Sequence, residues 1–437
     1  MKLWTCASLV LVVGFLAACQ RPFILEGERF PLRAAFSESA ADAPTNRAQP
    51  ISLPAPVANA EWTHRLGSAN TRLTHPAFNG AMQQLWSVPI GQGETRRVRI
   101  TAEPVAANGL IYTLDALARV TAVTPDGAVA WSVDLTPAGT RNPELVSGGG
   151  LTVAGGRLYV SSAHGFVHAL DLRTGATIWA KRFDAPVTAP VTVAGERVFV
   201  VDAHSGAWAL EAATGKTDWA VAGTPSPAAM VGGAAPALVG DLVVFPTSAG
   251  ELIAVNRTTG QTNWKAIVAG TRIGVAYASV TDVTGDPVVQ GDTIYVGNQS
   301  GRVMALSRLD GRPIWTAMEA AYGPVWPVGG SVFLLSDRNR LIRLNASDGS
   351  LIWSQPLPLY TEIRERRRAQ IFPHYGPVLA GGRLIVGSGD GVLRSFDPVS
   401  GAMTGEVPLR SGAAVAPIVV GGRLYVVTRD GQLVAFR

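Results

Sequence analysis

The chain repeats one unit, which is most complete in Ala169-Leu170-Asp171-Leu172-Arg173-Thr174-Gly175-Ala176-Thr177-Ile178-Trp179. Its first residues close one β-strand, the Thr-Gly pair forms a tight turn, and the tryptophan lies in the next strand. The glycine supplies the positive φ that such a turn needs, and the aspartate four residues earlier can hydrogen-bond the turn backbone. The unit therefore predicts a β-hairpin that presents one large aromatic side chain.

The spacing of glycine and tryptophan recurs along most of the chain. Six tryptophans have a glycine four residues earlier, at Gly127/Trp131, Gly175/Trp179, Gly215/Trp219, Gly260/Trp264, Gly311/Trp315 and Gly349/Trp353. Together with Trp86, these tryptophans follow one another at intervals of 38 to 51 residues, close to the ~40–50 residues of a four-stranded propeller blade. We expect each of the seven indole rings to pack one blade on the next.

The two ends of the chain complete each other. Eight segments have the pattern of a first blade strand, beginning at Pro104, near Gly149, and at Pro190, Pro236, Pro287, Pro324, Pro377 and Pro417. The last unit stops at Arg437 after its third strand, whereas Leu85-Trp86-Ser87-Val88 is a fourth strand with no unit before it. Pairing these fragments removes two open sheet edges. The sequence thus predicts an all-β fold over residues 61–437, an eight-bladed β-propeller of four-stranded antiparallel blades whose last blade is closed by the N-terminal strand.

Two points qualify this prediction. Gly405 stands where the seventh unit should have its tryptophan, so we expect a weaker contact between blades there. A β-solenoid or several β-sandwiches remain alternatives to a single ring, since both also combine many short strands with glycine-rich turns.

The N-terminal region has the layout of an exported lipoprotein. Residues 1–18 form a signal peptide, with a basic start and an apolar run too short for a comfortable membrane span. Leu16-Ala17-Ala18-Cys19 resembles a bacterial lipobox, which implies cleavage before Cys19 and its acylation, and Gln20 favours the outer membrane. The alternative is an ordinary signal peptide with an incidental cysteine. Residues 19–60, rich in alanine and proline, predict a flexible tether between the acylated Cys19 and the propeller.

Composition excludes several classes of protein. Charged residues make up 16% of the chain and hydrophobic residues 47%, which excludes intrinsic disorder. Two cysteines exclude a disulfide scaffold and a cysteine-rich metal site. The net charge of +5 is modest and the basic residues are spread over many turns, so we expect no nucleic-acid partner.

The Ala-x-Asp-x-x-Thr-Gly-x-x-x-Trp pattern resembles the tryptophan-docking repeat of pyrroloquinoline-quinone-type propellers. One branch, the quinoprotein dehydrogenases, has a vicinal cysteine pair, which the mature chain cannot form. The other is the BamB family of lipoproteins, which the lipobox, the length and the eight blades resemble. That resemblance implies a non-enzymatic scaffold of the outer-membrane β-barrel assembly (Bam) complex, facing the periplasm, with no catalytic, cofactor-binding or metal-binding residues. Its implied partners are a BamA-like barrel protein bound through its POTRA domains, other Bam lipoproteins and outer-membrane lipid, with unfolded outer-membrane proteins as further candidates.

The same resemblance points to a docking loop. The segment 279–288 is similar to an acidic loop with which the family binds a POTRA domain, and Asp282 and Thr284 stand at the two docking positions. The second docking loop would fall near residues 220–226, which lack the family's leucines and arginine. The alternative for Asp282 is an Asx-turn residue ahead of a strand.

Other polar clusters have simpler interpretations. His164 and His168 share H-x-x-x-H spacing but lie in a turn and a strand, so we interpret them as repeat residues and not as metal ligands. The run Arg364–Arg368 is either a loop for an acidic partner or anionic headgroups, or a solvated loop with internal ion pairs. We expect Trp208 and Trp326 in the core. A quinone-dependent periplasmic oxidoreductase and a polysaccharide-binding propeller remain the alternative functions.

Overall fold

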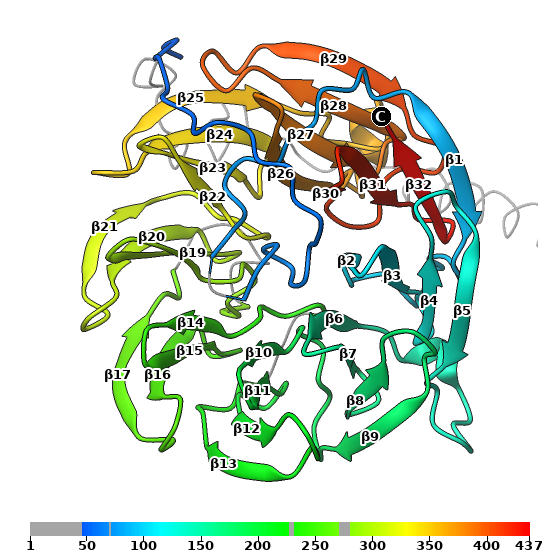
Figure 1. The fold of residues 1–437 in the computed structure, drawn as a ribbon. Helices are drawn as coiled ribbons and strands as arrows, with labels where there is room; N and C mark the ends of the chain where they lie inside the picture. The colour runs from blue at the N-terminus through cyan, green and yellow to red at the C-terminus, as the bar shows by residue number, and fades with distance from the viewer. Residues whose placement is uncertain (1–45, 70, 227–230, 271–279) are drawn as a thin grey trace, which may run out of the picture. The chain divides into compact units, whose positions relative to one another are not determined.

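The computed structural model describes residues 46–69, 71–226, 231–270 and 280–437. These residues form eight four-stranded antiparallel sheets, which stand as blades around a central hub (Figure 1). The eight-bladed, all-β prediction is therefore confirmed. The predicted signal peptide, Cys19 and the tether as far as residue 45 lie outside the described residues. No helix in the described part of the chain is both long and apolar enough to cross a membrane.

Seven blades contribute their strands in chain order from the hub outward, and the eighth does so for its first three strands and takes β1 as its outermost. The innermost strands are β2 (Val105–Ala107), β6 (Gly149–Ala154), β10 (Thr192–Ala194), β14 (Ala237–Val239), β18 (Val288–Gln290), β22 (Trp326–Val328), β26 (His374–Ala380) and β30 (Ile418–Val420). The second strands are β3 (Leu110–Leu114), β7 (Arg157–Ser162), β11 (Arg197–Val201), β15 (Leu242–Pro246), β19 (Thr293–Asn298), β23 (Ser331–Leu335), β27 (Arg383–Ser388) and β31 (Arg423–Val427).

The outer half of each blade completes the sheet. The third strands are β4 (Arg119–Val123), β8 (Phe166–Asp171), β12 (Ala207–Glu211), β16 (Glu251–Asn256), β20 (Arg302–Ser307), β24 (Arg340–Asn345), β28 (Val392–Phe396) and β32 (Gln432–Phe436). The outermost strands are β5 (Val129–Asp134), β9 (Thr177–Arg182), β13 (Thr217–Val221), β17 (Thr262–Ile267), β21 (Pro313–Ala317), β25 (Leu351–Pro356), β29 (Met403–Pro408) and β1 (Gln84–Pro89).

Burial explains the residue types of these strands. The second strand β11 reads Arg-Val-Phe-Val-Val and is buried from its second residue on, because neighbouring blades cover both of its faces. The outermost strand β13 has exposed and half-buried residues only. Two-residue turns join first to second strands, as at Gly155-Gly156, where φ is +56° and +73°.

The docking tryptophans pack as predicted. Each indole ring lies against the turn glycine of the following blade, as Trp131 does against Gly175 and Trp179 against Gly215. Six of the indole N–H groups also donate to a carbonyl of that next turn, in the pairs Trp86–Pro125, Trp131–Leu172, Trp179–Ala212, Trp219–Arg257, Trp315–Ala346 and Trp353–Pro398. The indole N–H of Trp264 is buried without an acceptor in the described part of the chain.

The missing tryptophan at Gly405 has a structural reason. The eighth blade has no turn between its third and outermost strands, because those strands are the two ends of the folded chain. Met82 lies there instead, is 4% exposed, and places its Cε 3.9 Å from where a Cβ at Gly405 would stand. A tryptophan at 405 would have no turn glycine to pack on.

Strand β1 closes the ring as expected. It pairs antiparallel with β32, with Ser87 opposite Val434 and Val88 opposite Leu433. Gln83 and Arg437 extend the ladder with two further backbone hydrogen bonds of 3.0 Å. The backbone N–H and C=O groups along the facing edges of β1 and β32 are thereby paired.

The end of the expected tether is bound to the ring. Gln49 and Pro50 accept hydrogen bonds from the guanidinium of Arg343, and the amide of Gln49 donates to Val399. These contacts hold residues 47–50 on the blades, although the sequence predicts a flexible tether there. Proline and alanine content alone does not reveal such bonds, because they join carbonyls of the tether to side chains about 300 positions away.

Candidate functional site

Residues 59–82, called the strap below, cross one end of the hub (Figure 1). The strap bonds to the innermost strands of three consecutive blades. Trp62 exchanges backbone hydrogen bonds with Ala106, the Thr63 carbonyl accepts from Val153, and the His64 ring accepts from Val193. A segment with no repeat of its own is therefore held by the repeats around it.

The far part of the strap is bonded on the other side of the hub. Arg72 donates to the Val325 carbonyl at 3.0 Å, and His75 accepts from the Gly382 amide at 2.8 Å. At the near end of the strap, Asn59 donates to the Val419 carbonyl of the eighth blade at 2.7 Å. The strap thus crosses this end of the hub and joins blades that are distant in sequence.

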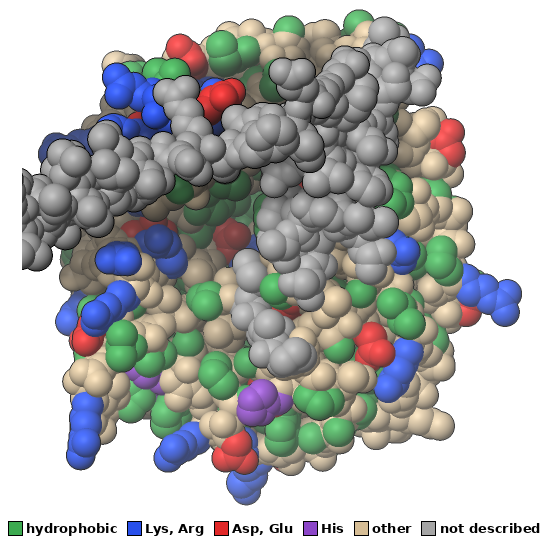
Figure 2. All heavy atoms as spheres, turned by 180° about the vertical axis from the view of Figure 1, so that it is seen from behind, with side chains coloured by type: hydrophobic (Ala, Val, Ile, Leu, Met, Phe, Trp, Pro, Cys, Tyr) green, Lys and Arg blue, Asp and Glu red, His purple; other side chains and the backbone are tan. Residues whose placement is uncertain are grey.

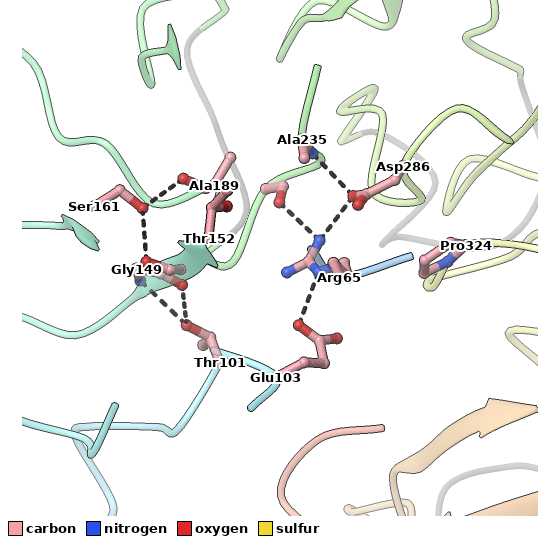
Figure 3. Close-up of polar contacts among 12 residues, drawn as sticks. Arg65, Thr101, Glu103, Gly149, Thr152, Ser161, Ala189, Ala235, Asp286 and Pro324 are labelled. Carbon is pink, nitrogen blue, oxygen red and sulfur yellow. Dashed lines mark hydrogen bonds and ion pairs between the residues drawn. The ribbon is translucent and has the colours of Figure 1, made fainter. Parts of the chain in front are cut away.

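An ion cluster ties the strap to the hub wall (Figure 3). The guanidinium of Arg65 contacts Glu103 and Asp286, each at 2.8 Å, and donates to the Gly233 carbonyl at 3.1 Å. Asp286 also accepts from the Ala235 amide at 2.9 Å. Burial lowers the pKa of Arg65, but the charges of Asp286 and Glu103 outweigh it and raise that pKa above its usual range.

Arg72 is buried beside this cluster without an ion pair of its own. It is 7% exposed, stacks 4.3 Å from the centroid of Trp326, and bonds the carbonyls of Pro324 and Val325. No carboxylate of the described residues lies within ion-pair distance of it. Burial lowers the pKa of Arg72 to about 9, only partly opposed by Asp286 and Glu103.

The hub contains a cavity of about 460 Å³. The strap forms its floor, and the cavity opens on the face of the ring opposite to the strap. Figure 2 shows this face, which is hollowed where hydrophobic, acidic and basic side chains meet. Trp62, Arg65 and Arg72 of the strap line it from below. Its walls come mainly from the connections that precede the innermost strands and from the start of β26. The charged and aromatic side chains there are Glu94, Arg99, Glu103, Tyr322, Phe372, His374 and Tyr375.

The predicted docking residues lie in the wall of this hub. Asp282 and Thr284 are 5% and 7% exposed, and the Thr284 hydroxyl donates to the Ala321 carbonyl at 3.1 Å. The segment from residue 280 to Asp286 carries one side chain into the ion cluster and lines the cavity with Thr284. The docking role of Asp282 and Thr284 stays a prediction.

Other predicted residues are spread over the ring. His164 and His168 lie in and after one blade turn, and burial lowers the pKa of His168 to about 4. No group of three or more potential metal-ligating side chains occurs within the described ranges. Trp326 is fully buried, as expected, whereas Trp208 is half-buried and donates to Asp202 at 2.8 Å.

The Arg364–Arg368 run forms an exposed connection between the sixth and seventh blades. It contains the 3-10 turn η3 (Glu365–Arg367), and the connection begins and ends at an isolated bridge between Tyr360 and Ile371. Arg368 stacks 5.0 Å from the Tyr360 ring and lies 3.5 Å from Glu365. This geometry fits both interpretations of the arginine run, a solvated loop with internal ion pairs and a loop that binds an acidic partner or anionic headgroups.

Comparison with known proteins identifies the family. The family model described as outer membrane protein assembly factor BamB matches residues 116–355 and 364–437. This chain belongs to the BamB family. The two matched ranges are separated by residues 356–363, where the connection with the arginine run begins.

Individual relatives agree with this assignment. The chain is 33% identical to outer membrane protein assembly factor BamB of Legionella pneumophila (strain Paris) over 77% of its own length and 83% of the relative. It is 32% identical to that of Escherichia coli (strain K12), over 70% and 76% of the two chains.

Solved structures show the same fold. BamB from Moraxella catarrhalis matches with a TM-score of 0.65 at 19% identity, over 82% of this chain and 98% of that one. Quinohemoprotein alcohol dehydrogenase from Comamonas testosteroni also gives a TM-score of 0.65, at 15% identity, over 86% and 80% of the chains. At these identities the likeness concerns the fold alone, so the dehydrogenase match gives no support for the oxidoreductase alternative.

Sequence reasoning missed the residues that build the hub. Arg65, Arg72 and Tyr375 lie outside the repeat motif, and Asp286 was passed over in favour of Asp282 four positions earlier. One signal was available: residues 62–75 combine tryptophan, two histidines and two arginines directly after an alanine- and proline-rich stretch. Such a mixture of large and charged side chains is unusual for a tether.

Proposed function

We propose that this chain is a non-enzymatic scaffold subunit of the machinery that assembles β-barrel proteins in the outer membrane. The observation that carries the proposal is the family match, which begins in the first blade and, apart from residues 356–363, continues to Arg437. The relatives from Legionella and Escherichia are both named outer membrane protein assembly factors. Seven tryptophans pack the blades on one another, and the strap bonds several blades together. A ring held in this way is suited to presenting loops at fixed positions.

We propose further that the partner is a BamA-like barrel protein, bound through its POTRA domains. The connections on the cavity face are the candidate surface, since they join consecutive blades and are longer than the turns within a blade. Asp282 and Thr284 are buried, so a direct role for their side chains requires residues 280–284 to rearrange on binding. A contact through their exposed surroundings needs no such change.

The proposed location is the periplasmic side of the outer membrane, with Cys19 as the lipid-bearing residue. Two acyl chains anchor a protein stably where one does not. The chain between Cys19 and residue 46 can extend at most ~95 Å, at ~3.3–3.6 Å per residue. The ring would therefore stay within reach of the membrane surface and of other membrane-bound subunits.

Co-purification tests the partner. The full chain is isolated from outer membranes in mild detergent, and the barrel-assembly subunits that accompany it are identified by mass spectrometry. We expect a BamA-like protein with the wild-type chain, and less of it with Asp282→Arg. Asp292→Arg, which changes an exposed aspartate of the turn before β19, is the matched control and should retain the partner. Recovery of the wild-type chain with no barrel-assembly subunit would count against the proposal.

A separate experiment tests the anchor. Cys19→Ser should abolish lipid attachment, seen as loss of the acyl mass on the mature N-terminal peptide. The variant should also move from the membrane fraction to the soluble periplasmic fraction. An unchanged distribution would show that Cys19 does not hold the protein at the membrane.

A further inference from the structure

We propose that the hub cavity is a binding site for a small organic carboxylate, whose charged group pairs with Arg72 and whose flat apolar body fills the space above the strap. This goes beyond the scaffold function, which requires no small ligand. The inference rests on the charge balance of the cavity, on free hydrogen-bonding groups in its lining, and on the apolar character of its walls.

Arg72 has no carboxylate in direct contact among the described residues. Arg65 takes both nearby carboxylates, Glu103 and Asp286, by direct contact. Glu94 is held by Arg429 at 2.8 Å. A buried guanidinium without a paired anion is costly, because its charge has lost most of its hydration. An anion entering the cavity would supply the missing partner.

Arg72 also keeps hydrogen-bonding capacity for a ligand. Its Nε and Nη2 donate to Val325 and Pro324, while its Nη1 makes no hydrogen bond to the described residues. A guanidinium has five N–H donors, and its planar fork suits a carboxylate. The pKa of Arg72, lowered by burial to about 9, still leaves the side chain charged at neutral pH.

Tyr375 offers a second donor in the same cavity. Its hydroxyl makes no hydrogen bond to the described residues, although the side chain lines the cavity and is half-buried. Burial raises the pKa of Tyr375 above its usual range, and the negative charge of Glu94 raises it further. The hydroxyl therefore stays protonated at neutral pH. It can therefore donate to a carboxylate oxygen.

The remaining lining limits the ligand to a small, largely apolar molecule. Ile100, Leu335, Phe372, Val378 and Val415 are among the residues around the cavity. A volume of about 460 Å³ lies within the ~300–1,000 Å³ usual for small-molecule sites. Because Arg72 is the one buried arginine of the lining with no carboxylate partner among the described residues, the site favours a single negative charge.

The test uses 4-iodobenzoate as the probe, with the neutral 4-iodobenzamide as its matched control. Calorimetric titration measures affinity for the folded full-length mature protein, and anomalous scattering from iodine locates the probe in crystals. We expect 4-iodobenzoate to bind at least tenfold more tightly than the amide, with the iodine in the hub cavity. Absence of binding at millimolar 4-iodobenzoate, equal affinity for both probes, or iodine found elsewhere would each overturn the proposal.

Variants assign the charged contact. Arg72→Leu should weaken 4-iodobenzoate binding at least tenfold and leave 4-iodobenzamide binding unchanged. Arg97→Leu removes an exposed arginine two residues from Arg99 that does not line the cavity, and it should bind like the wild type. If circular dichroism shows that Arg72→Leu does not fold, Tyr375→Phe takes its place, with an expected loss of at least threefold. Wild-type affinity in whichever folded variant is measured would refute the assignment.

Discussion

Gly175 and Trp131 face each other across the boundary between two blades. A Cβ at position 175 would stand 2.6 Å from Cε3 of the Trp131 ring, a distance that no side chain can occupy. The glycine thus serves two purposes, because its φ of +72° also forms the tight turn. Each repeat unit therefore contributes to two boundaries between blades. Its glycine packs against the indole of the previous blade, and its tryptophan packs against the glycine of the next blade.

Gly175→Ala should destabilise the ring by about 2–4 kcal/mol. Roughly 1–2 kcal/mol comes from placing a Cβ at positive φ, and the rest from overpacking against the indole. The change is measured as a shift in the midpoint of urea unfolding. Gly156→Ala separates the two effects, since its φ is +73° but no atom lies within 4 Å of the new Cβ. Equal losses in both variants would mean that the contact with Trp131 adds nothing.

Asp286→Asn should cost about 3–5 kcal/mol, because it leaves Arg65 buried with one of its two carboxylates removed. Asp292→Asn breaks an ion pair with Arg308 whose aspartate is 84% exposed, and should cost ~0–1 kcal/mol. Unfolding midpoints of the two variants give the comparison. A difference within error would show that the hub cluster stabilises the fold no more than a surface pair.

His64 should make stability fall with acidity between pH 6.5 and about 4. Burial lowers the pKa of His64 to about 4, so the unfolded chain binds a proton in this range that the folded chain does not. In the folded protein His64 is neutral, and its Nε2 accepts a hydrogen bond from the Val193 amide. Protonation of Nε2 would remove this hydrogen bond, because the nitrogen could no longer accept. The stability present above pH 6.5 should decline by roughly 3 kcal/mol as the pH falls to 4.

His64→Gln is expected to flatten that dependence, because glutamine does not titrate. The unfolding midpoint is followed from pH 7 to pH 4 in wild type and variant. His204→Gln, at an exposed turn position, should keep the wild-type slope. A His64→Gln profile parallel to that of the wild type would place the proton uptake at other groups.

Deletion of residues 432–437 should lower the thermal midpoint and expose strand β1 to proteases. The deletion removes β32, the partner of β1, and leaves two unpaired strand edges. Limited proteolysis should then cut within residues 84–89. Arg437→Ala, which keeps the backbone ladder and removes only side-chain bonds to Gln83, should resist cleavage. Resistance of the deletion variant would show that the ring does not depend on this pairing.

The fold could be predicted because its information is local and repeated. Seven blades contain the turn glycine, and all but the seventh contain the tryptophan for the next boundary, so one complete unit such as 169–179 predicts the others. Closure could be predicted from two incomplete units at the ends. The absence of tryptophan at 405 could be seen but not explained, because its cause is the position of Met82 in space.

The hub could not be predicted for the opposite reason. Arg65 and Asp286 are 221 positions apart, and neither belongs to the repeat. Residues 46–82 have no periodicity, and their order comes from bonds to carbonyls and amides of distant blades. A sequence pattern carries no trace of such pairings, and only the assembled ring brings them together.

The strap has a consequence for how polypeptides can meet this ring. A propeller with an open axis would allow a chain to be threaded from one face to the other. Here Trp62, Arg65 and Arg72 line the bottom of the hub cavity, and the strap that carries them is hydrogen-bonded to the blades. The strap therefore forms the floor of the cavity, and a molecule that enters the cavity from the face shown in Figure 2 must leave by the same opening.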